Sequence, residues 1–160
     1  MALAREKLDR SVAIDEAVGR ESTTLVFQLS QRGQLALADH RPGDALQDFE
    51  RAMPIAEKLA TIRATTRTVL ARGRGEAPLT LGRAAEAIPL VERSLELETA
   101  GGDPRDVAQS GFLLARVLWT AAPASRRRAR ELAEGARTTF VKLDLGDDAS
   151  RVAMWLAAHR

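Results

Sequence analysis

Histidines and clustered carboxylates are the side chains of this sequence whose chemistry could serve catalysis or metal binding. His40 lies in a polar stretch beside Asp39, Arg41 and Asp44, and His159 is the penultimate residue. A zinc site or a proton relay needs several such groups facing one another, but the sequence has only 2 histidines and no cysteine. The pattern indicates a solvated turn at His40 and a fraying helix end at His159. It predicts no metal site and no cofactor.

Three aspartates, Asp144, Asp147 and Asp148, surround Gly146. General acid–base catalysis needs two carboxyls in a pocket with different pKa values, whereas a glycine followed by aspartates is typical of one helix ending and the next being capped. We therefore expect capping. Glutamate pairs are expected on exposed helix faces, at Glu96 and Glu98 and at Glu131 and Glu134. The sequence also lacks a nucleophile-elbow serine and a phosphate loop, so it predicts that the protein is not an enzyme.

The densest positive charge is the run Ser125–Arg130. Such a run can contact phosphate or acidic partners, or it can be a solvated polar face. Nucleic-acid binding needs a wider excess of positive charge or stacking aromatics, but the net charge is +2 and aromatic residues make up 4% of the sequence. We expect no nucleic-acid partner. We expect no membrane partner either, since no segment has the roughly 20 apolar residues that span a bilayer. Without a secretory signal, the expected location is the cytoplasm.

Strong helix formers dominate the elements that must position these side chains. Ala, Leu, Arg and Glu are abundant, and asparagine, which favours hairpin turns, is absent. Apolar residues recur at helical spacing, as in Leu46, Phe49 and Met53, and Asp103-Pro104 predicts a helix start. The predicted fold class is all-α. We expect eight helices, at residues 1–18, 22–38, 43–59, 62–80, 84–99, 104–121, 125–143 and 148–159.

A period of 42 residues runs through the chain. It is kept by two sets of small residues, Ala45, Ala87 and Ala129, and Ala52, Ser94 and Ala136. Gly33 and Gly75 are also 42 residues apart. The period predicts a single domain of helical repeats over residues 1–160. Its parts are a half repeat at 1–18, repeats at 22–59, 62–99 and 104–143, and a closing helix at 148–159.

This pattern resembles the tetratricopeptide repeat (TPR), whose unit is two antiparallel helices with small residues where they cross. Three copies of its signature are recognised: Gly33, Ala45, Phe49 and Ala52; Gly75, Ala87, Val91 and Ser94; and Ala115, Ala129, Ala133 and Ala136. The usual period is shorter, and 42 resembles the longer-helix variety of kinesin light chains and many bacterial regulators. Pro78 and Pro54 should kink or shorten their helices, while Pro89 is close enough to a helix start to be tolerated.

The resemblance implies a right-handed superhelical solenoid whose concave groove binds a peptide or protein partner. Twelve side chains from the first helix of each repeat are expected to line it: Phe27, Ser30, Gln34, Leu37, Val69, Arg72, Glu76, Leu79, Gln109, Phe112, Arg116 and Trp119. The set mixes apolar anchors with polar groups, as a recognition surface does. The alternative is that several of these side chains belong to the core. Trp155 is expected to pack the closing helix onto the last repeat.

A second interpretation comes from the segment 81–93, which is similar to the repeat arms that follow Ser/Thr protein kinase domains in bacteria of the myxobacterial type. It makes the chain a regulatory or sensor arm of a larger bacterial signalling protein, such as a kinase or a transcription regulator. The kinase motifs themselves are absent from this sequence. The two interpretations, an interaction scaffold and a regulatory arm, stay open at this point.

The two ends are expected to differ. A helix over 1–18 carries the apolar residues Leu3, Leu8, Val12 and Ile14 without a first helix of its own repeat. Because exposed apolar patches favour association, the sequence predicts a loose or self-associating N-terminal end and a firm C-terminal end.

Overall fold

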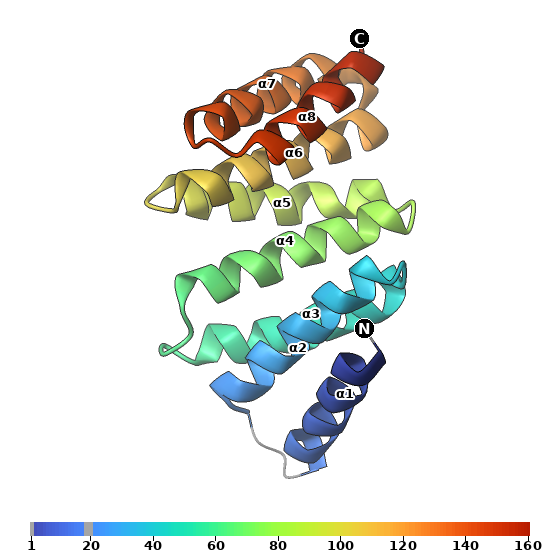
Figure 1. Ribbon diagram of the computed structural model, residues 1–160, viewed down its shortest axis with the longest axis vertical. Helices are drawn as coiled ribbons and strands as arrows, with labels where there is room; N and C mark the ends of the chain where they lie inside the picture. The colour runs from blue at the N-terminus through green and yellow to red at the C-terminus, as the bar shows by residue number, and fades with distance from the viewer. Residues whose placement is uncertain (1, 18–20) are drawn as a thin grey trace. The chain divides into compact units, whose positions relative to one another are not determined.

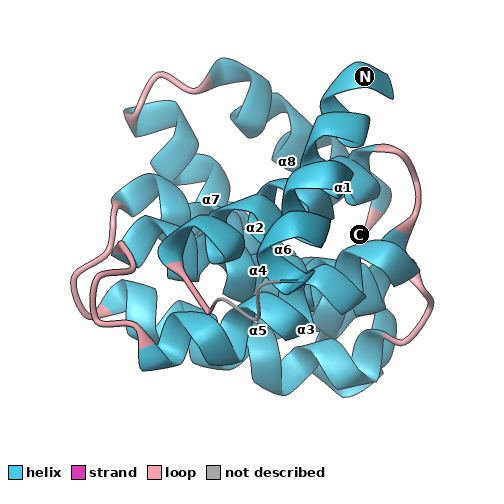
Figure 2. Cartoon of the chain, turned by 90° about the horizontal axis from the view of Figure 1, so that it is seen from below, coloured by secondary structure: helices cyan, strands magenta, loops and turns pink. Residues whose placement is uncertain are grey.

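A computed structural model describes residues 2–17 and 21–160 of the chain. Its regular elements are eight α-helices and one short 3-10 helix, with no strand among the described residues (Figures 1 and 2). The bounds are α1 Ala2–Ala17, α2 Thr23–Ala38, α3 Pro42–Lys58, α4 Ala64–Thr80, α5 Ala84–Thr99, α6 Pro104–Ala121, η1 Pro123–Ser125, α7 Arg126–Lys142 and α8 Gly146–Ala158.

The helix starts follow local capping chemistry. The Ser22 side chain accepts a hydrogen bond from the Leu25 amide at 3.1 Å, and Asp103 accepts one from the Arg105 amide at 2.8 Å. Each bond satisfies an amide that has no partner within its helix. Residues Pro54, Pro78 and Pro89 all lie inside helices that continue past them. The expected shortening of the helix at Pro78 is therefore slight, since α4 ends at Thr80.

The chain forms two compact units, residues 1–81 and 82–160. The first holds α1–α4 and the second α5–α8. Within the first unit α1 packs on α2, α2 on α3, and α4 on both α2 and α3. Within the second unit α6 packs on α5 and α7, and α8 packs on α7. The division at Leu81 falls inside the expected repeat 62–99, and that repeat division stays a prediction.

Phe49 of α3 is the largest fully buried side chain of the first unit's core. Its ring lies against Gly33 of α2 and Gly73 of α4, where a Cβ atom would collide with it. The absence of a side chain at both positions lets the three helices approach closely around one aromatic ring. Aliphatic side chains fill the rest of this core, among them Val12, Leu25, Val26, Leu29, Leu70 and Ala77.

A buried ion pair joins α2 to α3 in the same unit. Arg32 donates from Nε and Nη2 to the two carboxylate oxygens of Asp48, at 2.8 and 2.5 Å. The Asp48 side chain is only 5% exposed, so this bidentate contact supplies the partners that a buried carboxylate requires. Asp9 of α1 adds a weaker contact to Arg32 at 3.5 Å. Arg67 of α4 donates to the carbonyls of Ala56 and Leu59, at the end of α3.

Small residues of α7 make the core of the second unit. Ala129, Ala133 and Ala136 are buried together with Phe140, and α7 packs along α6, whose Leu114, Ala115 and Val117 are fully buried. Alanine at these positions lets the two helices approach closely. Figure 1 shows α7 and α8 next to α6, which carries the longest run of buried residues in this unit.

Two loops between paired helices share a left-handed backbone. His40 has φ 56° between α2 and α3, and Gly82 has φ 76° between α4 and α5. These residues are 42 positions apart in the sequence. The loop conformation therefore repeats with the sequence period although the residue does not, and His40 pays a steric penalty that Gly82 avoids.

The first helix is only partly consistent with a loose N-terminal end. Val12 is fully buried, whereas Ile14 is 57% exposed, and Gln28 of α2 donates to the Ser11 hydroxyl at 2.6 Å. Met1, residues 18–20 and the Leu3 side chain lie outside the described part of the chain. Self-association through this helix stays a prediction. Among the described residues, no helix has the length and apolar character needed to cross a membrane.

Candidate functional site

The expected groove residues of the first unit lie on α2 and α4, which pack against each other. On α2, Phe27 is 57% exposed and Gln34 is also exposed. Leu37 is half-buried and packs against the core, and Ser30 is buried. Ser30 therefore cannot contact a partner, which corrects its assignment to the groove. On α4, the four expected side chains are all half-buried: Val69, Arg72, Glu76 and Leu79.

The expected residues of the second unit lie on α6. Gln109, Arg116 and Trp119 are half-buried, but Phe112 is buried at 8% exposure. Its ring meets Trp155 of α8 edge to face, with the ring centroids 5.8 Å apart. Phe112 is thus a packing residue between α6 and α8, and its assignment to the groove is wrong for the same reason as that of Ser30.

An aromatic cluster surrounds Trp119 in the second unit. Trp155 packs edge to face against Trp119 at 5.7 Å, and His159 lies stacked on Trp155 at 4.3 Å with 16° between the rings. The Arg126 guanidinium lies 4.9 Å from the centre of the Trp119 ring. This geometry confirms that Trp155 packs α8 onto α6. It also forms a half-buried aromatic surface with a cation over it, of the kind that contributes to recognition.

His159 is held in place rather than frayed. Its Nδ1 atom lies 2.7 Å from the carbonyl oxygen of Trp155, and its own carbonyl accepts a hydrogen bond from Arg130 at 2.7 Å. The spacing of four residues between Trp155 and His159 places both rings on one helix face, and this is the signal that could have identified the pair. No sequence spacing indicated the contacts of Arg126 or Trp119.

The remaining candidate chemical groups have structural roles. α8 begins at Gly146 with Leu145 as its N-cap and no side-chain cap bond, so the expected capping by Asp147 or Asp148 is wrong. Asp148 pairs with Arg151 and, at 3.9 Å, with Arg105. The described residues contain no group of histidines, cysteines and carboxylates able to hold a metal ion.

Glu98 is another correction. It is 5% exposed rather than on a solvated face, and its Oε1 atom accepts hydrogen bonds from Ser94 at 2.8 Å and from Ser110 of α6 at 3.1 Å. Glu96, Glu131 and Glu134 are exposed, as expected.

The basic run 125–130 is used in separate intramolecular contacts. Arg127 pairs with Glu131 at 3.7 Å, Arg128 with Glu92 at 2.7 Å, and Arg130 with Glu134 at 3.6 Å. Because three of its guanidinium groups have carboxylate partners, the run is not a single patch for phosphate groups.

Comparison with solved structures places this arrangement among TPR-like repeat proteins. Two crystal structures of a Podosopora anserina protein, described as a kinesin light chain with nearly identical TPR-like repeats, match with TM-scores of 0.69 and 0.66 and 22% identity, over 88% and 87% of this chain. BtubC (BKLC) from P. vanneervenii matches with a TM-score of 0.70 and 20% identity over 94% of this chain. The fold is therefore the all-α, TPR-like repeat fold that the sequence predicts.

The likeness extends to the fold alone. This chain spans 66% of the Podosopora protein and 62% of BtubC. No protein-family model matches the sequence, and no curated protein sequence matches it significantly. None of these three structures links the chain to a kinase, so the regulatory-arm interpretation stays a prediction.

Proposed function

We propose, on the premise of a TPR-like fold, that this chain is a non-catalytic interaction module that binds a peptide or protein partner. The carrying observation is the exposed face of α2, where Phe27 is 57% exposed on a helix whose opposite face fills the core. An exposed aromatic ring beside an exposed amide, that of Gln34, offers an apolar anchor and an orienting hydrogen bond. The half-buried Val69, Arg72 and Leu79 of α4 extend this surface in the same unit.

The corresponding surface of the second unit is made by Arg116 and Trp119. Both are half-buried, and Trp119 is supported from behind by Trp155. A ring held by its neighbours loses little conformational freedom when a partner binds, so it serves as a rigid anchor. Buried Ser30 and Phe112 support this surface without contacting the partner.

The test is a peptide-display screen against the full chain, followed by fluorescence anisotropy with the selected peptide. Phe27→Ala should weaken binding about tenfold, the loss that about 1.4 kcal/mol of an aromatic anchor represents, and Gln34→Ala should weaken it less. Val141→Ala is the matched control, since Val141 is a 64% exposed apolar residue of α7 outside the proposed surface. An enriched peptide that binds Phe27→Ala as tightly as the unmodified chain would contradict the proposal, and so would a screen that enriches none.

A further inference from the structure

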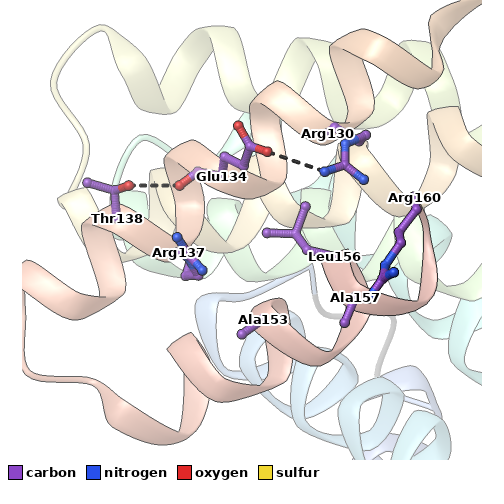
Figure 3. Close-up of a pocket in the computed structure, with 8 residues that line it drawn as sticks. All are labelled: Arg130, Glu134, Arg137, Thr138, Ala153, Leu156, Ala157 and Arg160. Atoms are coloured by element: carbon purple, nitrogen blue, oxygen red, sulfur yellow. Dashed lines mark hydrogen bonds and ion pairs between the residues drawn. The ribbon is translucent and has the colours of Figure 1, made fainter.

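A second surface lies between α7 and α8, away from the proposed α2, α4 and α6 faces. It is a groove of about 800 Å³ lined only by residues of α7, α8 and the turn that follows α8 (Figure 3). Its floor is made by Ala153, Leu156 and Ala157 of α8, which share one helix face because they are three and four residues apart.

The sequence period identifies what this floor is built to receive. α7 and α8 begin 42 residues after α5 and α6. The floor residues therefore correspond, 42 positions earlier, to three residues of α6: Gly111, Leu114 and Ala115. All three are buried, and α7 is a helix that packs along α6. The α7–α8 groove thus repeats a surface that holds a helix within the same unit.

The rim of the groove departs from that surface in charge. Arg130, Arg137 and Arg160 line it, and Figure 3 shows their side chains around Leu156 and Ala157. Their counterparts 42 positions earlier are aliphatic: Ile88, Leu95 and Leu118. None of these counterparts is exposed. Three apolar contacts of the covered surface are therefore replaced by guanidinium groups in the open one.

The charge of the groove is not balanced by its own carboxylates. Glu134 is the one acidic side chain among the lining residues, and it lies 3.6 Å from Arg130. Among the described residues, no carboxylate forms a salt bridge with Arg137 or Arg160. Guanidinium groups at an apolar edge recognise carboxylates through paired hydrogen bonds.

We propose that the α7–α8 groove binds an acidic amphipathic helix of a partner protein. α7 itself indicates the apolar face of such a helix, since it presents buried Ala129, Ala133 and Ala136, at i, i+4 and i+7, to its own unit. The bound helix has small residues in that pattern against Ala153, Leu156 and Ala157. Its flanks carry aspartate or glutamate, which pair with Arg137 and Arg160. This surface is distinct from Phe27 and Trp119, so the inference does not rest on the proposed function.

The test uses the full chain and a stapled helical peptide of about 14 residues, stapled because isolated helices of that length are marginal in water. The peptide has alanine at i, i+4 and i+7 and glutamate on both flanks. Matched peptides carry lysine in place of glutamate, or the same residues in scrambled order. We expect saturable binding of the glutamate peptide alone, weakened by added salt because the pairs are partly exposed. The methyl signals of Ala153 and Ala157 should shift on binding.

Charge-reversal variants locate the interaction. Arg137→Glu and Arg160→Glu should each weaken binding about three- to tenfold, and the double variant should prefer the lysine peptide. Arg127→Glu is the control, because this α7 side chain is 92% exposed and outside the groove; its effect should be under about twofold. Phe27→Ala should leave this binding unchanged, which separates it from the proposed function. The inference is overturned by no saturable binding up to about 1 mM, by equal binding of the scrambled peptide, or by an equal loss in Arg127→Glu.

Discussion

The ring of Phe49 occupies the space that a side chain at Gly33 would need, since a Cβ atom there would lie 2.7 Å from Cε1 of the ring. The opposite edge of the same ring, at Cε2, meets Gly73 in the same way. One aromatic side chain of α3 is thus held between glycines of α2 and α4. Gly33 also belongs to the small-residue signature of the sequence, whereas Gly73 does not.

Alanine at either glycine should destabilise the protein. We expect Gly33→Ala and Gly73→Ala each to lower the free energy of unfolding by about 1–3 kcal/mol through overpacking, although alanine is the better helix former by about 1 kcal/mol. Urea unfolding followed by circular dichroism measures the change. The matched control is Gly135→Ala within α7, where a Cβ meets no atom within 4 Å; it should raise stability by about 0.5–1 kcal/mol. An equal gain in Gly33→Ala would show that the ring moves freely.

The ion pair between Arg32 and Asp48 should contribute more than pairs on the surface. Asp48→Ala leaves a guanidinium that is only 21% exposed without its bidentate partner. We expect a loss of about 1–3 kcal/mol in the free energy of unfolding, because Asp9 at 3.5 Å compensates only in part. Glu96→Ala is the control, since the Arg93–Glu96 pair is 69% and 67% exposed, and its loss should stay within about 0.5 kcal/mol. Equal losses in the two variants would contradict the argument from burial.

The left-handed loop residues should respond in opposite directions to substitution. Gly82→Ala should lower stability by about 1–2 kcal/mol, because φ is 76° and no neighbouring atom within 4 Å would add a steric effect. His40→Gly should raise it by up to about 1 kcal/mol, since it removes the strain at φ 56° but adds freedom to the unfolded chain. Thermal unfolding measures both. Gly43→Ala, at an open site with no positive φ, should not share the loss.

The pKa of Glu86 should lie below its ordinary value of 4.5, chiefly because Arg83 donates hydrogen bonds to the carboxylate, with the guanidinium charge adding to the effect. Arg83 Nε and Nη2 lie 2.8 and 2.6 Å from the carboxylate oxygens. A lowered folded-state pKa means that the pair stabilises the fold above pH 4.5 and that this contribution is lost as the pH falls through the lowered value. An NMR titration should show the carboxyl signal of Glu86 moving to higher pH in Arg83→Ala and staying unchanged in Arg93→Ala. Identical curves in the unmodified chain and Arg83→Ala would refute the assignment.

Local chemistry explains why the helices could be predicted. Their periodicity is carried by neighbouring residues, and a start such as Asp103-Pro104 acts within one turn. The burial of Glu98 could not be predicted in this way. Its helix neighbour Ser94 is visible in the sequence, but Ser110 comes from α6. A carboxylate inside the unit is thus stabilised by a contact that exists only after two helices have paired.

The groove residues show the same limit. The repeat frame fixed which helix each residue occupies, but a helix turns a face of roughly 100° to its neighbours, and one helix position decides between contact and burial. Ser30 and Phe112 fall on the buried side of that boundary, whereas Phe27 falls on the exposed side. Trp119 was correctly placed on the accessible surface of α6, but its contacts with Arg126 and His159 depend on how the chain turns after α6 and α8.

The order of packing within each unit has a consequence for time. Most helix contacts join elements that are consecutive along the chain, such as α2 with α3 and α6 with α7. Closing such short loops takes little entropy, and folds made of local contacts form in roughly microseconds to milliseconds. A ribosome adds about 5–20 residues each second. The α2–α3 hairpin therefore has time to form and to enclose Phe49 on one side before α4, which carries Gly73, has been synthesised.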